Sequence, residues 1–331
     1  MREEMSKIPV SEFDIIYISY DEPTCEEFWA DLVEKVPWAQ RIHGVTGFDS
    51  AHKAAAGLSE TSRFITVDAD NIVFPEFFDQ ELDMSRVGEQ DVISWGGRNK
   101  INGLIYGNGG LKCWPKDVVQ NMRTHENADS EKNQIEFCWD INYIQMNNCY
   151  SEVWPNGSPY QAFRAGFREG VKMSLDQGQR VKPHEFRQKI YHKNLKRLFI
   201  WCSVGTDVEN GLWSIYGSRL GAEKTTLSDW DIHNIRDFNW FKEFWKQTIA
   251  PEFYSETGRK CLKTGFAYDP EKLKDSVFET GEKLRKEAGL SIAELDSNAS
   301  CFFKEVYENP LRIDPMITEK TVEQITHGII N

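Results

Sequence analysis

Two aspartates separated by one residue stand out as groups that could bind a metal. Asp68 and Asp70 follow residues 63–67, a short run of apolar and β-branched side chains that predicts a buried strand. Two carboxylates that leave a strand in this way can converge on one hard cation, and oxygen ligands suit Mg²⁺ or Mn²⁺. Such a cation would bridge a pyrophosphate and stabilise the charge on a departing phosphate. A solvated turn or a helix cap is the alternative, so the surrounding elements must decide.

The chain before these aspartates alternates between strands and helices. Residues 13–19, 40–45 and 63–67 predict strands, and residues 26–35 and 50–58 predict helices, the second with Ser50 as a plausible cap. This order is typical of a parallel, nucleotide-binding sheet. Because such sheets bind ligands beyond the carboxyl ends of their strands, Tyr20 and Asp21 are expected at the same edge as the two later aspartates.

The later chain predicts more strands and then helices. Residues 91–95 predict a strand, and a glycine-rich stretch leads from there to a further strand around residues 112–114. Residues 159–175 have helical spacing of their apolar side chains. The tail beyond residue 251 is charged and is predicted to be mostly helical, so one α/β domain with a helical C-terminal region is expected.

Composition limits the classes of partner and compartment. The 331 residues include 39 basic and 52 acidic ones, giving a net charge of -13, which disfavours a general polyanion binder. Residues 164–197 are the exception, with ten basic and three acidic side chains. The seven cysteines are scattered and form no CxxC pair, which favours a reducing compartment over a disulfide frame or a zinc site. With neither a signal peptide nor a membrane-length apolar run, the sequence predicts a soluble cytoplasmic protein.

Four segments resemble the GT-A glycosyltransferases. FITVDADN resembles the strand of that family that ends in Asp-x-Asp, ISYDEP resembles its first-strand loop, and HKAAAGL resembles the helix before the Asp-x-Asp strand. INGLIYGNGGLKCWPKDV resembles the acceptor-side loop and strand with their Gly-Gly pair. The resemblance covers about residues 11–154, and only the Asp-x-Asp and Gly-Gly segments are specific. More loosely, the chain is similar to phage glycosyltransferases, some of which modify hydroxymethylated DNA bases; a phage enzyme would act in the host cytoplasm.

This resemblance implies a GT-A, Rossmann-like fold with a mixed, mostly parallel central sheet. Residues 1–250 would form the catalytic domain, with a nucleotide-sugar half at 11–110 and an acceptor half at 111–250, followed by the helical region 251–331. The implied reaction transfers a hexose or pentose from a nucleotide-sugar, with a UDP-sugar as the expected donor, to a hydroxyl. Mn²⁺ or Mg²⁺ would assist departure of the diphosphate.

The same resemblance suggests roles for individual residues, each with a plainer structural alternative. Asp68 and Asp70 would hold the metal, with Asp70 as the stronger ligand, and His233 is a candidate third ligand that could equally be structural. Asp140 is the candidate catalytic carboxylate, as the general base of an inverting enzyme or as a group that stabilises the sugar cation in a retaining one, or else it is a carboxylate at a helix N-terminus. The predicted donor contacts, which could instead be ordinary turns and an exposed helix face, are Tyr20, Asp21, Lys53, Asp68, Gly109 and Gly110.

The basic segment bears on the acceptor. Arg164, Arg168 and Lys172 are spaced at i, i+4 and i+8, so they share one face of the predicted helix, where they could contact a DNA backbone. A hydroxymethyl pyrimidine such as 5-hydroxymethylcytosine in phage DNA is therefore one expected acceptor, with a protein, glycan or small molecule also open. A solvated helix face with intramolecular acidic partners explains the same pattern.

Two other classes of function fit parts of the sequence. Phosphatases of the haloacid dehalogenase type also have a strand that ends in Asp-x-Asp, but there the motif lies on the first strand, whereas here it follows the third. A catalytically inactive, nucleic-acid-associated binding module would use the basic segment and leave Asp68 and Asp70 structural. Metal-dependent nucleotide binding would count against the second alternative.

Overall fold

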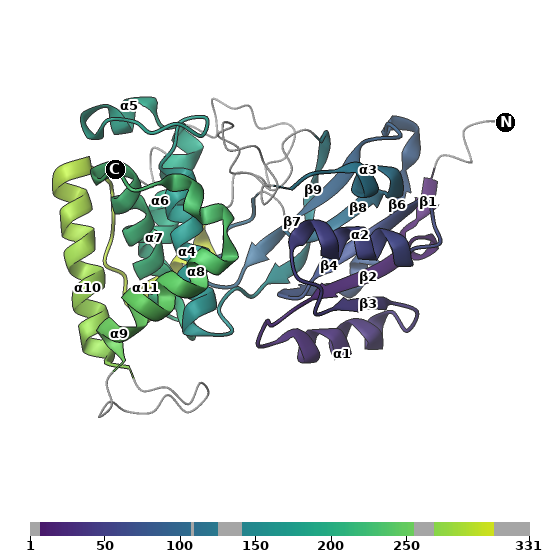
Figure 1. The fold of residues 1–331 in the computed structure, drawn as a ribbon, viewed down its shortest axis with the longest axis horizontal. Helices are drawn as coiled ribbons and strands as arrows, with labels where there is room; N and C mark the ends of the chain where they lie inside the picture. Colours follow the sequence, from purple (N-terminus) through teal and green to yellow (C-terminus); the bar gives the residue numbers. More distant parts are fainter. Residues whose placement is uncertain (1–6, 107–108, 125–140, 255–267, 308–331) are drawn as a thin grey trace.

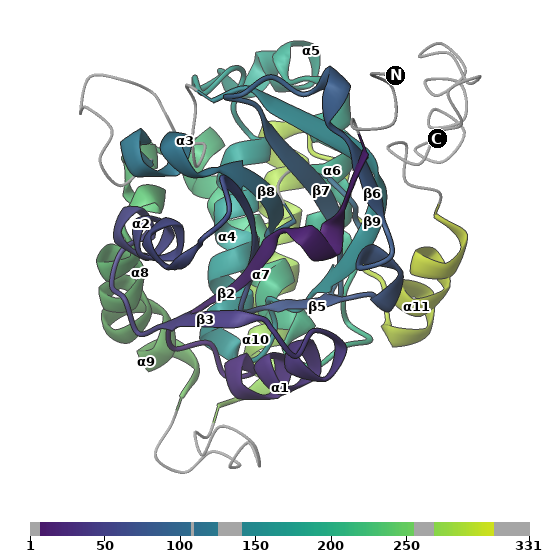
Figure 2. The same cartoon turned by 90° about the vertical axis from the view of Figure 1, so that its right-hand side faces the viewer.

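The strands and most of the helices separate into two parts of the molecule. The computed structural model describes residues 7–106, 109–124, 141–254 and 268–307. Strands occupy one side of the view in Figure 1, and the helices from α4 onwards occupy the other. Figure 2 looks along the same molecule from the strand side. The carboxyl ends of several strands therefore face a layer of helices.

A curled, mixed sheet of seven strands forms the first part in the described residues. Its order is β3-β2-β4-β8-β7-β9-β5, and β2 pairs in parallel with both β3 and β4. Following the pairings across the sheet, β2, β3, β4, β7 and β9 point one way while β8 and β5 point the other. The strands are β2 (Asp14–Ser19), β3 (Gln40–His43), β4 (Arg63–Asp68), β5 (Asn71–Val73), β7 (Val92–Asn99), β8 (Leu111–Pro115) and β9 (Tyr143–Val153).

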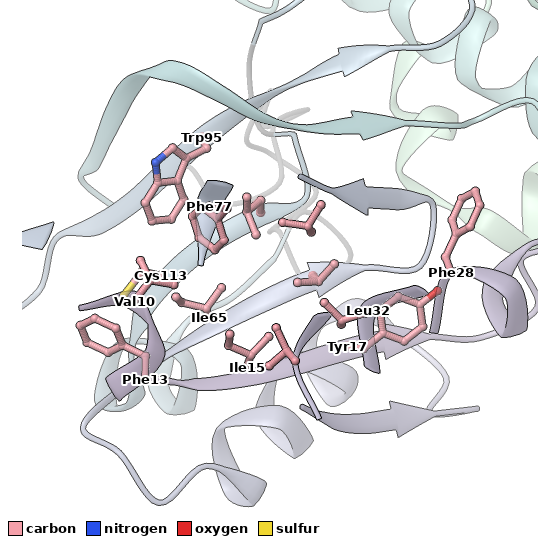
Figure 3. Packing of buried hydrophobic residues seen from close by; sticks show 14 of the residues in the cluster. Val10, Phe13, Ile15, Tyr17, Phe28, Leu32, Ile65, Phe77, Trp95 and Cys113 are labelled. Carbon is pink, nitrogen blue, oxygen red and sulfur yellow. The ribbon is translucent and has the colours of Figure 1, made fainter. Parts of the chain in front are cut away.

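Both faces of the central strands β2, β4, β8 and β7 are largely buried, which explains the unbroken apolar runs in these strands. Successive strand residues point to opposite faces. Ile15 and Tyr17 of β2 pack on one face with Ile65 and helix α1 (Cys25–Lys35), as Figure 3 shows. Ile16 packs on the other face, against α2 (Phe48–Leu58) and α3 (Lys116–Asn121). A separate antiparallel pair joins β1 (Lys7–Pro9) to β6 (Glu81–Asp83).

Helix α2 begins earlier than the sequence predicts. Gly47, with a φ of 92°, is the N-cap in place of Ser50, which lies inside the helix. A positive φ suits glycine, so the chain can turn directly into Phe48. Asp49 in the first turn is buried, and its carboxylate accepts a hydrogen bond from the Thr124 N–H at 2.8 Å. The expected cap was wrong because a glycine turn precedes it.

The second part consists of helices packed around α4 and α7. Gly166 and Gly170 of α4 face Gly217 and Gly221 of α7 across a contact so close that a Cβ on any of them would overlap a backbone carbonyl of the other helix. Phe163 and Trp213 anchor the aromatic core beside it. The helices are α4 (Pro159–Met173), α5 (Phe186–Lys189), α6 (His192–Ser203), α7 (Gly211–Leu227), η6 (Ile232–Arg236), α8 (Phe238–Phe244), η7 (Trp245–Ile249), α9 (Ala250–Phe253), α10 (Pro270–Lys283), η8 (Leu284–Ala288) and α11 (Ser297–Val306).

The structure confirms an α/β fold with a mixed sheet, and the predicted strands and helices around Asp68 are present. The helical part begins at Pro159, directly after β9, and so includes most of the predicted acceptor half. Leu273 and Val277 of α10 share the core of α4 and α7. Residues beyond 251 therefore pack with the earlier helices. None of the helices in the described ranges is long and apolar enough to cross a membrane.

Candidate functional site

The carboxyl ends of β2 and β4 carry the acidic residues singled out in the sequence. Asp68 is the last residue of β4, and Asp70 follows in a short loop before β5. Backbone contacts hold this loop. The Tyr17 hydroxyl donates to the Ala69 carbonyl at 3.0 Å, and the Trp154 N–H donates to the Asp70 carbonyl at 2.7 Å. The two carboxylates therefore project from a firmly held turn.

The Asp70 carboxylate lies in a strongly acidic environment. Burial raises its pKa to about 7, and the negative charges of Asp68 and Glu22 add to the rise. Arg164 on α4 acts in the opposite direction. Asp68 and Glu22 therefore act on Asp70 through their charge, and Arg164 of the helical part opposes them. Among the described residues, however, these three acids do not bring one oxygen each within 4.8 Å of the others. A cation bound among these carboxylates would relieve their repulsion.

Glu22 is a site residue that the sequence reasoning missed. It lies three residues after β2, and its Oε2 accepts a hydrogen bond from the Tyr20 N–H at 2.7 Å. This bond folds the loop back towards the strand end. Glu22 follows the named Tyr20–Asp21 pair in the sequence, so the signal was its position in the same strand-end loop. Its closeness to Asp70 depends on the parallel pairing of β2 with β4.

The chemistry of these side chains fits a hard divalent cation. Carboxylate oxygens are the donors that Mg²⁺ and Mn²⁺ prefer, and one or two carboxylates together with substrate phosphates are enough to hold Mg²⁺. In addition, the Oδ1 atom of Asn71 is buried and accepts no hydrogen bond from the described part of the chain. A partnerless acceptor beside an acid cluster indicates that a further polar group completes the site.

The two predicted glycines pack against this site. Gly110 has a φ of 78°, and a Cβ on it would lie 2.8 Å from Asp68 Oδ2 and 2.5 Å from Asn71 Nδ2. Its carbonyl accepts from the Asp68 N–H at 3.1 Å. Gly109 lies against the backbone of Gly97 in β7. Close backbone approach thus explains both glycines, and their predicted contact with a sugar stays a prediction.

Helix α2 turns His52 inward and Lys53 outward. His52 is buried, its ring packs 5.7 Å from that of Trp114, and its Nδ1 lies 3.0 Å from the Phe48 carbonyl oxygen. Burial lowers the His52 pKa, while the nearby charge of Asp68 opposes this shift. Lys53 is exposed on the opposite face. His52 is therefore the α2 residue next to the acids, and phosphate binding by Lys53 stays a prediction.

Tyr20 and Asp21 meet the helical part through α8. The Nζ of Lys242 lies 3.3 Å from an Asp21 carboxylate oxygen and 5.4 Å from the centre of the Tyr20 ring. Phe238, at the start of α8, packs its ring 5.0 Å from that of Phe48 in α2. Helix α8 therefore borders the strand ends, and both predicted donor residues lie between the two parts of the molecule.

The basic row on α4 is only half-exposed, and its members already have neighbours within the protein. The Arg164 guanidinium lies 4.7 Å from the Phe238 ring centre, and that of Arg168 lies 5.4 Å from it. Lys172 pairs with Glu169 at 3.3 Å, and both side chains are largely buried. This arrangement favours an intramolecular role, and DNA contacts by the three residues stay a prediction.

The described part of the structure does not place His233 or Asp140 beside Asp68 and Asp70. The His233 Nδ1 lies 2.8 Å from an Asp231 carboxylate oxygen, after α7. Among the described residues, no group of three potential ligands joins His233 to Asp68 and Asp70. Asp140, the predicted catalytic carboxylate, lies outside the described residues. Both roles stay predictions.

A separate group of potential metal ligands lies where the start of α1 meets the end of β3. Cys25, Glu26 and His43 each offer an atom within 4.8 Å of the others. The guanidinium of Arg41 is already there, at 2.6 Å from Glu26 Oε1 and 3.1 Å from His43 Nδ1. A bound metal would have to compete with this fixed positive charge, so the cluster is better explained as the binding site of Arg41.

Comparisons with known proteins add no family assignment. No protein-family profile matches the sequence, and no curated protein shows significant similarity to it.

Proposed function

We propose that the protein is a metal-dependent glycosyltransferase that uses a nucleotide-sugar donor. The observation that supports this best is the position of Asp68, Asp70 and Glu22 at or just after the carboxyl ends of the parallel strands β2 and β4. Ligands of open α/β sheets bind at that edge. Oxygen ligands for a hard cation at that position suit a substrate that carries a diphosphate.

The residues of the chain would then divide the work of the transfer. Asp68, Asp70 and Glu22 would hold Mn²⁺ or Mg²⁺, and the bound cation would supply stabilisation of the charge on the departing diphosphate. Arg164, on the other side of the acids, would offer a guanidinium to the phosphate oxygens. Tyr20 could stack on the base of the donor, and Asp21 could accept a hydrogen bond from it.

The acceptor is proposed to be a hydroxyl group, and a hydroxymethyl pyrimidine in DNA remains one candidate. The basic segment 164–197 motivates this candidate, although its members on α4 have intramolecular neighbours. A UDP-sugar remains the proposed donor.

Calorimetric titration with UDP, in Mn²⁺ and then in EDTA, tests the donor site. We expect binding that requires the metal and that is lost in Asp70→Ala. Lys53→Ala, on the exposed face of α2, leaves all three acids in place. Weaker UDP binding in this variant would therefore report the predicted phosphate contact of Lys53 and not a change in the acid site. Binding that persists in EDTA, or in folded Asp70→Ala, would contradict a metal-dependent donor site.

A further inference from the structure

Asn71 directly follows the two aspartates and lies between them and the glycine loop. It is the first residue of β5, it pairs with Val153 of β9, and only 2% of its surface is exposed. Its Nδ2 donates a hydrogen bond to Asp70 Oδ1 at 3.0 Å. A buried carboxamide on a paired strand has few rotamers open to it, so it can fix the orientation of the carboxylate that it contacts.

The orientation of this carboxamide is determined by its neighbours. If its oxygen and nitrogen were exchanged, the oxygen would face Asp70 Oδ1, and two acceptors would meet. With the nitrogen towards Asp70, one carboxylate oxygen is engaged and Oδ2 is left for another partner. The Asn71 nitrogen also lies close to Asp68, because Nδ2 and Asp68 Oδ2 are both within 2.8 Å of the point where a Gly110 Cβ would be.

The other end of the carboxamide indicates that this arrangement serves a ligand. Asn71 Oδ1 is buried and accepts no hydrogen bond from the part of the chain that is described. A buried acceptor without a partner destabilises the fold, and an apolar side chain of similar size would avoid that cost. Asparagine at this position is therefore better explained by the neighbouring acids than by stability.

We propose that Asn71 is a positioning residue for the metal site, which holds the Asp70 carboxylate so that its Oδ2 faces the cation. This inference rests on the proposed metal-dependent function and adds a residue to it. Residues that donate to metal-binding carboxylates and imidazoles typically change metal affinity by ten- to a hundredfold when they are replaced. Asn71 would act through Asp70, not by contact with the reacting groups.

Titration of the full-length protein with Mn²⁺, alone and with UDP, tests this proposal. Asn71→Leu keeps the size of the side chain but removes both of its polar atoms. We expect about tenfold or greater weakening of Mn²⁺ binding, while the melting temperature of the metal-free protein stays the same or rises. A purely structural role would give the opposite pattern, with a lower melting temperature and unchanged metal affinity in the folded protein.

A second variant and a matched control complete the test. Asn71→Ser introduces no large apolar group, and it decides the matter if Asn71→Leu does not fold. Ser151→Ala also removes a buried oxygen that has no hydrogen-bond partner among the described residues, on strand β9 opposite Val73 at the other end of β5, and should bind Mn²⁺ as the wild type does. Wild-type affinity in both Asn71 variants, with binding lost in Asp70→Asn, would overturn this inference alone. A wild-type protein that binds no Mn²⁺ would overturn the proposed function with it.

Discussion

The two ends of the β2–β4 pair carry carboxylates in opposite situations. At the amino end, one Asp14 oxygen accepts hydrogen bonds from the Ser59 hydroxyl at 3.0 Å and from the Glu60 and Thr61 N–H groups at 2.6 and 3.0 Å. Burial opposes ionisation there, but the hydrogen bonds prevail and lower the Asp14 pKa. At the carboxyl end, burial and two neighbouring acids raise the Asp70 pKa to about 7.

The difference separates a structural carboxylate from the one that we propose to be functional. Asp14 finds its donors within the chain and ties β2 to the turn before β4. Asp70 has two acids, Asp68 and Glu22, in its electrostatic environment, and its carboxylate accepts from the neutral amide of Asn71. A carboxylate that the fold leaves without sufficient positive charge gains stability only when a cation arrives. Variants of Asp70 and Asp14 test this contrast directly, and variants of Arg164 and Lys172 test how far it extends into the helical part.

The largest effect is expected from Asp70→Asn. If Asp70 holds the cation, turnover should fall by roughly a thousandfold or more, because several kcal/mol of charge stabilisation depends on the metal. The melting temperature of the metal-free protein should stay the same or rise, since a repulsive charge has been removed. Activity assays and thermal unfolding measure the two quantities. A folded, fully active variant would rule out the proposed role of Asp70.

Asp14→Ala should show the opposite pattern. We expect a loss of about 1 kcal/mol in the free energy of unfolding, because several part-buried or exposed donors lose their charged acceptor. A lowered pKa in the folded state stabilises the protein above the unfolded value of about 3.9, and this contribution disappears as the pH falls through the folded value. Urea unfolding at pH 7 and at pH 3 should therefore show a large and then a small difference from the wild type. Metal-dependent UDP binding should not change.

Arg164→Gln tests whether the helical part contributes to the site. Its guanidinium opposes the acidic field at Asp70, and removal should weaken UDP binding in Mn²⁺ by about tenfold if it contacts phosphate. The affinity for Mn²⁺ alone should stay the same or increase, because a nearby positive charge is gone. Calorimetry with metal alone and then with nucleotide separates the two steps. Unchanged affinity for UDP would place Arg164 outside the donor site.

Lys172→Met should have the smallest effect and separates the two ends of the basic row. Lys172 pairs with Glu169, whose carboxylate also accepts from the Tyr106 hydroxyl, so a loss of about 1 kcal/mol in stability is expected. UDP binding should be unaffected. If Lys172→Met instead weakened DNA binding and lowered the slope of log affinity against log salt concentration by about one, the predicted contact with a nucleic-acid backbone would be supported.

Local sequence patterns predicted the strand ends that carry Asp68 and Tyr20, but they did not identify every acidic residue near those ends. The strands before Asp68 and Tyr20 follow from short apolar runs, which both buried faces of the sheet require. Glu22 could not be assigned from sequence alone, because its approach to Asp70 depends on strand pairing. His52 could have been preferred to Lys53, since it shares a helix face with Ala55 and Ala56.

The role of α4 was the least predictable part. Its i, i+4 spacing of basic residues indicated a common face, but not what that face would meet. The close glycine contact with α7 and the aromatic ring of Phe238 orient it towards the strand ends. Such contacts join residues far apart in the chain, and no local pattern encodes them. A helix over residues 159–175 was predicted, but its packing with residues beyond 251 was not, for the same reason.

The glycine contact between α4 and α7 also determines which parts of the protein can move. Its backbones touch without intervening side chains, and the aromatic core surrounds them. The amides of these two helices should therefore be among the last to exchange with deuterated solvent, because they open only when the helical part unfolds. Arg164 is carried on this slowly opening pair.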